Sequence, residues 1–132
     1  MNLVDELKGR GLIEHTSADP DIILSRPRTV YLGIDPTADS LHVGHLVPIL
    51  LMRRLGEAGS KLIFLVGGGT GMIGDPKEKG ERALLDEKTL AKNTAALKAQ
   101  LKKLLYRTSF RMEDNATWLT RVKLIPFLRD IG

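Results

Sequence analysis

Two of the three histidines in this 132-residue chain stand together, in the run His42-Val43-Gly44-His45. Imidazoles at this i, i+3 spacing share one face of a helix, and the apolar residues that follow predict a helix here. The start of a helix carries free backbone N–H groups and the positive end of the helix dipole, and phosphates bind there. Gly44 leaves room for a flat ring against the backbone. The pattern predicts a site for nucleotide phosphates.

Polar residues precede the two histidines, where a short apolar stretch ends. Asp35, Thr37 and Asp39 follow Thr29–Ile34, which is rich in strand-forming side chains. Open α/β sheets place ligands at the carboxyl ends of their strands, so these side chains could hold a nucleotide while its phosphates react. Two alternatives stay open. The histidines are plain surface residues at a helix start, or they hold zinc together with Asp39.

Glycines form a second candidate site, the run Gly67-Gly68-Gly69-Thr70-Gly71-Met72-Ile73-Gly74. Residues 69–74 fit the G-x-G-x-x-G fingerprint of dinucleotide-binding folds, directly after a predicted strand. That fingerprint should open a helix, whereas Asp75-Pro76 interrupts one, and no G-K-[ST] ending of a P-loop follows. A tight turn across the sheet is one interpretation. We favour another, in which a small ligand lies against the glycine backbone and Asp75 faces it.

The hydrophobic pattern places both motifs on alternating strands and helices. Thr29–Ile34 and Lys61–Val66 predict strands, with a helix between them from about Leu41 and Ser40 as its N-terminal cap. A strand–helix–strand unit of about 38 residues implies a parallel sheet with a right-handed crossover. The buried face of this helix is predicted to comprise Val43, Leu46, Val47, Leu50 and Leu51.

Further elements are predicted on both sides of this unit. Residues 1–12 predict a short helix and residues 16–28 a connection. A helix of about 18 residues follows the charged stretch after the glycines, residues 106–112 suggest a third strand, and residues 122–131 a last helix. The predicted fold class is α/β, a Rossmann-like parallel sheet with flanking helices. Two aromatic residues are expected in the core, Trp118 and Phe127.

The composition narrows the class of protein. The chain has no cysteine, which excludes a disulfide scaffold, a thiolate zinc site and a cysteine nucleophile. Its apolar runs are far shorter than the roughly 20 residues of a membrane span. Residues 1–12 do not resemble a signal peptide, so we expect a cytoplasmic protein without a membrane partner. The net charge of +4 is compatible with nucleic acid or polyphosphate partners.

The residues around the histidines resemble one family. The stretch Tyr31-Leu32-Gly33-Ile34-Asp35-Pro36-Thr37-Ala38-Asp39-Ser40-Leu41-His42-Val43-Gly44-His45 resembles the strand, turn and His-x-Gly-His signature of bacterial-type tyrosyl-tRNA synthetases, which are class I aminoacyl-tRNA synthetases. Residues 65–76 are similar to the following strand and loop of that family, and residues 126–132 to a later helix of its catalytic domain. The His-x-Gly-His pattern alone is shared with other nucleotidyltransferases, whereas the longer string is far more specific.

The resemblance implies the reaction of a tyrosine–tRNA ligase. The carboxylate of L-tyrosine attacks the α-phosphate of ATP to give tyrosyl-adenylate and pyrophosphate, and the tyrosyl group then moves to the 3′ end of tRNA(Tyr). Such chemistry needs positioning and charge stabilisation more than a covalent nucleophile. Mg²⁺ is expected to come with ATP, without a metal site on the protein. The family is usually homodimeric.

The resemblance also implies roles for the residues around the nucleotide. Thr37 and His42 would stabilise the departing pyrophosphate, and His45 would contact the ribose side of ATP. Asp35 and Gly44 would line the adenylate site. The cations of a mobile loop in the family correspond to Lys79 and Arg82.

A third group of residues is implied to bind the amino acid. Tyr31 would hydrogen-bond the phenol hydroxyl of the tyrosine substrate, and Asp75 would meet its ammonium group. The same pocket would contain Gly33 and Asp35.

The chain departs from the family in its length. The second half of the nucleotide fold, with its Lys-Met-Ser-Lys-Ser-like loop, and the anticodon-binding region have no counterpart here. We therefore expect an N-terminal portion, with residues 1–28 as a helix and connection and residues 29–132 as half of the catalytic domain. The alternatives are an inactive or binding-only fragment with partial affinity for ATP and tyrosine, a stand-alone nucleotidyltransferase that uses the same histidines and, more distantly, a dehydrogenase.

Overall fold

The centre of the molecule is a parallel sheet. The computed structural model describes residues 2–72, 76–77, 80–81 and 86–131. Its three-stranded sheet has the order β1–β2–β5, formed by β1 (Thr29–Ile34), β2 (Lys61–Val66) and β5 (Phe110–Asp114). Both neighbouring pairs are parallel. The predicted α/β class with a parallel sheet is confirmed.

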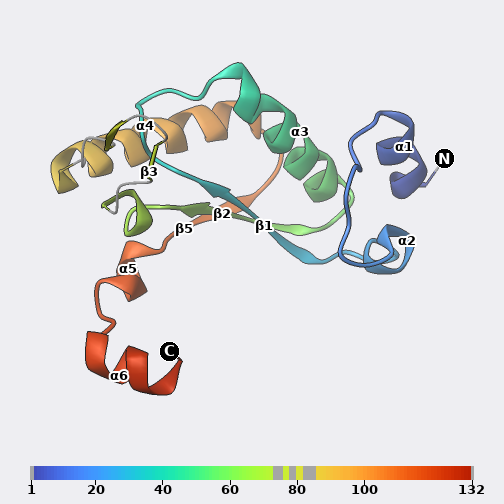
Figure 1. Cartoon of the computed structure of the whole chain (residues 1–132). Coiled ribbons are helices and arrows are strands. Elements are labelled where there is room, and N and C mark those ends of the chain that lie inside the picture. The colour runs from blue at the N-terminus through green and yellow to red at the C-terminus, as the bar shows by residue number, and fades with distance from the viewer. Residues whose placement is uncertain (1, 73–75, 78–79, 82–85, 132) are drawn as a thin grey trace.

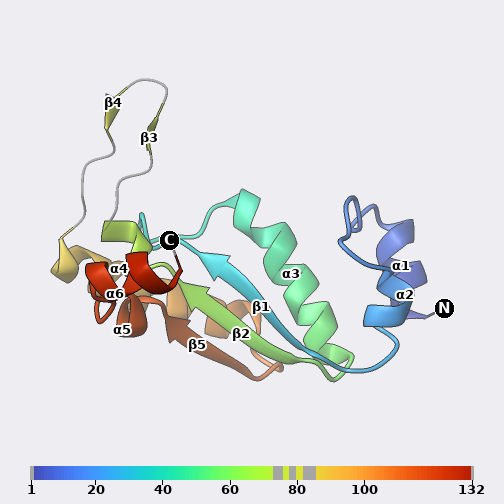
Figure 2. The same ribbon diagram turned by 60° about the horizontal axis from the view of Figure 1, so that its bottom comes forward.

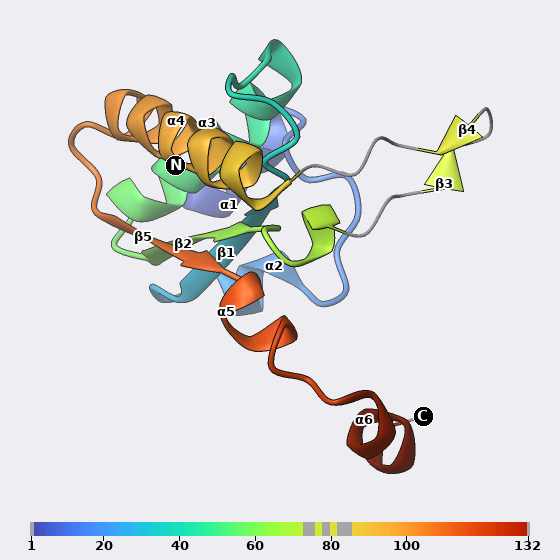
Figure 3. The same cartoon turned by 90° about the vertical axis from the view of Figure 1, so that its left-hand side faces the viewer.

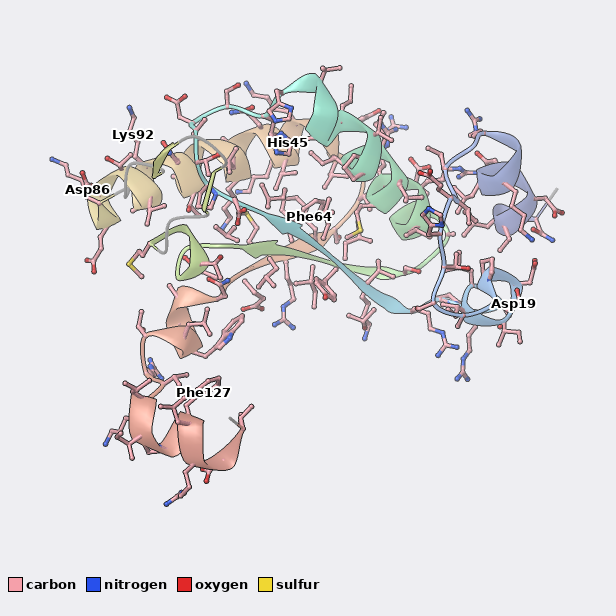
Figure 4. All side chains as sticks on the ribbon, viewed as in Figure 1. Asp19, His45, Phe64, Asp86, Lys92 and Phe127 are labelled. Atoms are coloured by element: carbon pink, nitrogen blue, oxygen red, sulfur yellow. The ribbon has the colours of Figure 1, made fainter. Side chains whose placement is uncertain are left out.

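Two long helices cover the same face of this sheet (Figure 1). α3 (Val43–Glu57) lies between β1 and β2 along the chain, and α4 (Glu87–Leu104) lies between β2 and β5. Parallel sheets bury apolar strands beneath such crossover helices. Phe64 of β2 is fully buried in this layer (Figure 4), and its ring meets that of Phe110 edge-on at 5.3 Å between centroids. None of the described helices is long and apolar enough to cross a membrane.

The beginning of α3 and its buried face differ from the prediction. The N-terminal cap is His42, not Ser40, whose Oγ instead donates to the carbonyl of Leu41 at 3.0 Å. The buried residues are Ile49, Met52 and Leu55, whereas Val43 is 82% exposed. The helix is apolar around most of its circumference, so its sequence pattern does not single out the side that the sheet covers. Of the predicted face, Leu46, Val47 and Leu50 are also exposed, and Leu51 packs partly against the core.

The N-terminal elements lie at one end of α3 (Figure 1). α1 (Leu3–Gly9) confirms the helix predicted in residues 1–12, and its Leu7 is buried in the main core cluster. α2 (Pro20–Ile23) is a short helix within residues 16–28, which had predicted only a connection. The N-terminal segment therefore contributes to the same core as the sheet.

Short elements follow β2. The 3₁₀ helix η1 (Thr70–Met72) comes directly after the first glycines. β3 (Pro76–Lys77) and β4 (Gly80–Glu81) form a separate antiparallel pair, which projects beyond the sheet in Figure 2.

The last part of the chain departs most from expectation. β5 begins four residues later than predicted and ends at Asp114, and the short helix α5 (Ala116–Leu119) was not predicted. α6 (Leu124–Asp130) confirms the last helix but lies apart from the sheet (Figure 3). Trp118 is 46% exposed and Phe127 44% exposed, so their assignment to the core is wrong. Trp118 lies on α5 and Phe127 on α6, and both are outside the layer that α3 and α4 form with the sheet.

Candidate functional site

The carboxyl ends of the three strands meet at one edge of the sheet (Figure 2). Ile34 is paired with Val66, and Val66 is paired with Asp114. The last residues of the three strands are therefore neighbours across the sheet. Asp35 follows β1, Gly67 follows β2 and Asn115 follows β5. Open α/β sheets bind ligands at this edge. The structure thus brings together the two motifs that the sequence singled out.

The glycine run is tied to both neighbouring strand ends by its backbone. The N–H of Gly67 donates to the carbonyl of Ile34 at 3.0 Å. The N–H of Gly68 donates to Oδ1 of Asp114 at 3.1 Å, and the same oxygen accepts the N–H of Ala116 at 2.9 Å. The Asp114 carboxylate therefore joins the end of β2 to the start of α5.

Asn115 makes a second connection of this kind. Its Oδ1 accepts the N–H of Gly69 at 2.7 Å, and its Nδ2 donates to Oγ1 of Thr70 at 3.2 Å. Asn115 is buried, and both ends of its amide are satisfied. Buried polar groups that are fully paired favour a single arrangement. Asn115 therefore fixes how η1 sits relative to β5.

Glycine is required where these side chains approach the loop. A Cβ atom on Gly67 would overlap Oδ1 of Asp35, and one on Gly68 would overlap the carboxylate of Asp114. A Cβ on Gly69 would lie 3.1 Å from Oδ1 of Asn115, tighter than ordinary contact. The glycines therefore make room for side chains of the neighbouring strand ends.

Asp114 and Asn115 were missed because the third strand had been placed at residues 106–112. With that boundary they lie beyond the strand end. The signal in the sequence was the pair itself, since polar residues directly after an alternating stretch mark a strand end just as Asp35 does after β1.

The rings of His42 and His45 lie against each other at the N-terminus of α3, with centroids 3.8 Å apart and an angle of 39° between their planes. Nδ1 of His42 accepts the N–H of Gly44 at 3.1 Å, and Nδ1 of His45 accepts the N–H of His42 at 3.2 Å. The two histidines thus form a reciprocal capping box. Since each Nδ1 is an acceptor, each neutral ring carries its proton on Nε2. The pair presents two Nε2–H donors beside the free N–H groups of the helix.

The pKa of His45 lies below the ordinary value for histidine. Burial is the main cause, because it disfavours the charged imidazolium, and the neighbouring His42 adds to the effect. The ring of His45 is therefore held in the neutral form that the capping box needs. Gly44 is required by the same arrangement, since a Cβ there would lie 2.9 Å from Cε1 of His42.

Tyr31 and Gly33 lie on the other face of the sheet. Residues alternate between faces along a strand, and α3 and α4 cover the face opposite to these two. Tyr31 is 72% exposed, and a Cβ on Gly33 would meet no described atom within 4 Å. The described residues thus leave space beside β1 on this face. Thr37 is also exposed, in the loop that leads to His42.

A cavity of about 550 Å³ opens beside the strand ends. Asp114 and Gly68 line it on one side, and Leu90 and Thr94 of α4 line the other. Its size lies within the range of small-molecule sites. Three predicted site residues, Asp75, Lys79 and Arg82, lie outside the described residues.

The arrangement of the histidines does not support the alternative of a zinc site. Among the residues that the structure describes, no three His, Asp or Glu side chains are grouped so that they could hold a metal ion. Oδ2 of Asp39 forms an ion pair with Nζ of Lys92 at 3.9 Å.

Comparison with known proteins places these features in a family. A sequence model described as tRNA synthetases class I (W and Y) matches residues 24–132. The tyrosine–tRNA ligase of Corynebacterium diphtheriae is 44% identical to 100% of this chain, which covers 33% of that protein. The tyrosine–tRNA ligase of Roseiflexus castenholzii is 47% identical to 98% of the chain, which covers 32% of it. The chain thus spans about a third of the length of these relatives.

Solved structures agree with the sequence relatives. A C-terminally truncated mitochondrial tyrosyl-tRNA synthetase of Aspergillus nidulans matches 98% of the chain with a TM-score of 0.75 and 28% identity. The corresponding protein of Coccidioides posadasii matches 98% of the chain with a TM-score of 0.73 and 28% identity. This chain covers 42% and 39% of those two chains.

Proposed function

Because this chain belongs to the class I tRNA synthetases of the tryptophan and tyrosine group, we propose that it is part of a tyrosine–tRNA ligase. In the proposed reaction the carboxylate of L-tyrosine attacks the α-phosphate of ATP, and tyrosyl-adenylate and pyrophosphate form. The tyrosyl group then passes to the 3′ end of tRNA(Tyr). Relatives named tyrosine–tRNA ligase, at 40–47% identity, support tyrosine rather than tryptophan as the amino-acid substrate.

The histidine pair at the start of α3 is the observation that carries the proposal. As pyrophosphate leaves, negative charge develops on its oxygens, and donors already in place stabilise that charge without reorganising. The Nε2–H group of His42 is such a donor, because the capping box holds its ring, while the ring of His45 beside it faces the ribose side of ATP. The hydroxyl of Thr37 and the dipole of α3 would act on the same charge. This chemistry depends on positioning and charge stabilisation more than on a covalent nucleophile.

The remaining site residues surround the reacting atoms in this proposal. Asp35 and Gly44 line the adenylate, next to the histidines. Tyr31 accepts or donates a hydrogen bond at the phenol hydroxyl of tyrosine, and Gly33 leaves space for its ring on the uncovered face of β1. The ammonium group of the substrate is assigned to Asp75, and the mobile-loop cations to Lys79 and Arg82.

The proposal also includes the metal ion that accompanies ATP, the oligomeric state and the cellular compartment. Mg²⁺ would enter bound to ATP, since it prefers phosphate oxygens and the described residues hold no group of three metal ligands. It would neutralise charge on the polyphosphate, while Thr37 and His42 stabilise the departing pyrophosphate. The proposed protein is a cytoplasmic homodimer, with residues 1–28 as an N-terminal helix and connection and residues 29–132 as the N-terminal half of the catalytic domain.

Tyrosine-dependent exchange of labelled pyrophosphate into ATP tests the proposal. We expect exchange that requires tyrosine and is lost in the His42→Ala/His45→Ala variant, with the far-UV spectrum unchanged. Exchange that does not need tyrosine would favour a stand-alone nucleotidyltransferase. ATP binding without exchange would favour a binding-only fragment. Binding of NADH instead of ATP, measured by fluorescence titration, would replace the proposal with a dehydrogenase.

A further inference from the structure

The loop between β1 and α3 has unusually little support from its own backbone. Residues 37–40 are exposed, and the loop ends at the histidine pair. Among the described residues, every hydrogen bond that ties residues 36–41 to another element comes from two side chains of α4. An ion pair of Lys92 with Asp39 at 3.9 Å is exposed and contributes little.

Asn93 holds the beginning of the loop. Its Nδ2 donates to the carbonyl of Pro36 at 2.9 Å. Asn93 is 5% exposed and lies among leucines on the buried face of α4, while Pro36 is fully buried. A polar side chain in such a place costs free energy unless it is hydrogen-bonded, so this contact is the reason that an amide is tolerated there.

Gln100 holds the end of the loop with both atoms of its amide. Its Oε1 accepts the N–H of Leu41 at 2.9 Å, and its Nε2 donates to the carbonyl of Asp39 at 2.9 Å. The side chain therefore replaces a strand neighbour for this stretch of loop. It is the only glutamine in the chain.

The spacing of the two amides suits this task. Seven residues of helix place Asn93 and Gln100 on the same face, roughly 10 Å apart along the axis. α4 itself is anchored beneath them, because Leu97 and Leu101 are buried in the core cluster. A rigid helix thus holds both ends of a loop that would otherwise be free to move.

We propose that Asn93 and Gln100 are positioning residues that set the path of residues 36–41 and so place Thr37 and His42 against the nucleotide. The part of this proposal that concerns the histidines and the nucleotide rests on the proposed function. The part that concerns the path of the loop does not. The two amides act through the loop and touch no reacting atom. They define one rigid unit that contains the end of β1, the start of α3 and the middle of α4.

The path of the loop is tested first, by hydrogen exchange in the full 132-residue chain. In Gln100→Leu the amide of Leu41 loses its acceptor, and we expect it to exchange about tenfold faster. Lys103→Leu is the matched control, because it adds the same side chain at an exposed position of the same helix. Gln100→Glu keeps an acceptor for Leu41 but turns an oxygen toward the carbonyl of Asp39, so we expect a smaller increase. Equal Leu41 exchange in Gln100→Leu and Lys103→Leu would overturn the proposal.

The effect on the site is tested by nitrogen chemical shifts of the histidine rings and by ATP affinity. We expect Asn93→Leu and Gln100→Leu to shift the Nε2 signal of His42 and to raise the Kd for ATP about tenfold, while Lys103→Leu does neither. If Asn93 and Gln100 only stabilise the fold, both substitutions lower Tm but leave the Kd of the folded protein for ATP unchanged. That result would overturn the proposal that the two amides position the site. If the unmodified chain does not bind ATP, the proposed function fails, and Leu41 exchange and the ring shifts still decide whether the amides position the loop.

Discussion

The carboxyl end of the sheet and helix α6 are close along the chain but are stabilised in different ways. At the sheet end, Asp114 and Asn115 satisfy backbone groups of a loop about 46 residues away in sequence. On α6, Ile125 is 74% exposed, and so is Ile131, which follows the end of the helix. The first region is held by hydrogen bonds between distant segments, and the second by the bonds of its own helix. The strand-end residues of the candidate site are therefore positioned by hydrogen bonds between distant segments.

Substitution of Gly68 should give the largest effect. A Cβ there overlaps the carboxylate of Asp114, so Gly68→Ala displaces that carboxylate from its hydrogen bonds to the N–H groups of Gly68 and Ala116. We expect the free energy of unfolding to fall by about 3 kcal/mol. Urea unfolding measures this, with Gly33→Ala as the matched control, because a Cβ at Gly33 meets no described atom within 4 Å. Equal losses in the two variants would mean that glycine flexibility, not close approach, matters at position 68.

Asn115→Ala should have the next largest effect. It removes the acceptor for the N–H of Gly69 and leaves that buried donor unpaired. The expected loss is about 2 kcal/mol in the free energy of unfolding. Asn115→Asp keeps the acceptor and should recover part of this, which chemical denaturation of the two variants can compare. If Asp is no better than Ala, the bond to Gly69 does not stabilise the fold.

A smaller effect is expected from the protonation of His45. Its folded-state pKa is below the ordinary value of 6.5, because burial favours the neutral ring. The unfolded chain takes up the proton first as the pH falls. The stabilisation is therefore complete above about pH 6.5 and is lost as the pH falls from there through the lower folded-state pKa.

The pH dependence of Tm checks this assignment. His45→Asn offers a side-chain acceptor that does not titrate, so its Tm should lack the step that we expect for the unmodified chain as the pH falls below about 6.5. A step of the same size in His45→Asn would assign it to another group.

The smallest effect is expected on α6. Ile125→Ser replaces a side chain that is already exposed, so the free energy of unfolding should change by less than about 0.5 kcal/mol. Ile49→Ser, at a fully buried position of α3, is the matched comparison and should be strongly destabilising. Thermal unfolding of both variants at several protein concentrations checks this. A large loss in Ile125→Ser would show that α6 is covered in solution.

The strand–helix–strand unit and the position of the histidines could be predicted from the sequence. Both depend on local properties, since a short apolar run bounded by Asp35-Pro36 forms a strand and the spacing of His42 and His45 places both rings on one helical turn. The buried face of α3 could not be predicted, because a helix that is apolar on several sides needs a neighbour to select one.

Local chemistry thus determined the parallel α/β framework, the glycine run and the paired histidines. Tertiary structure alone decided that Asp114 and Asn115 meet that glycine run, and that Asn93 and Gln100 of α4 hold the loop before His42. The physical reason is that these hydrogen bonds join residues 46 to 59 positions apart. Neither propensity nor periodicity acts over such a separation, whereas the stacking of parallel strand ends and crossover helices does.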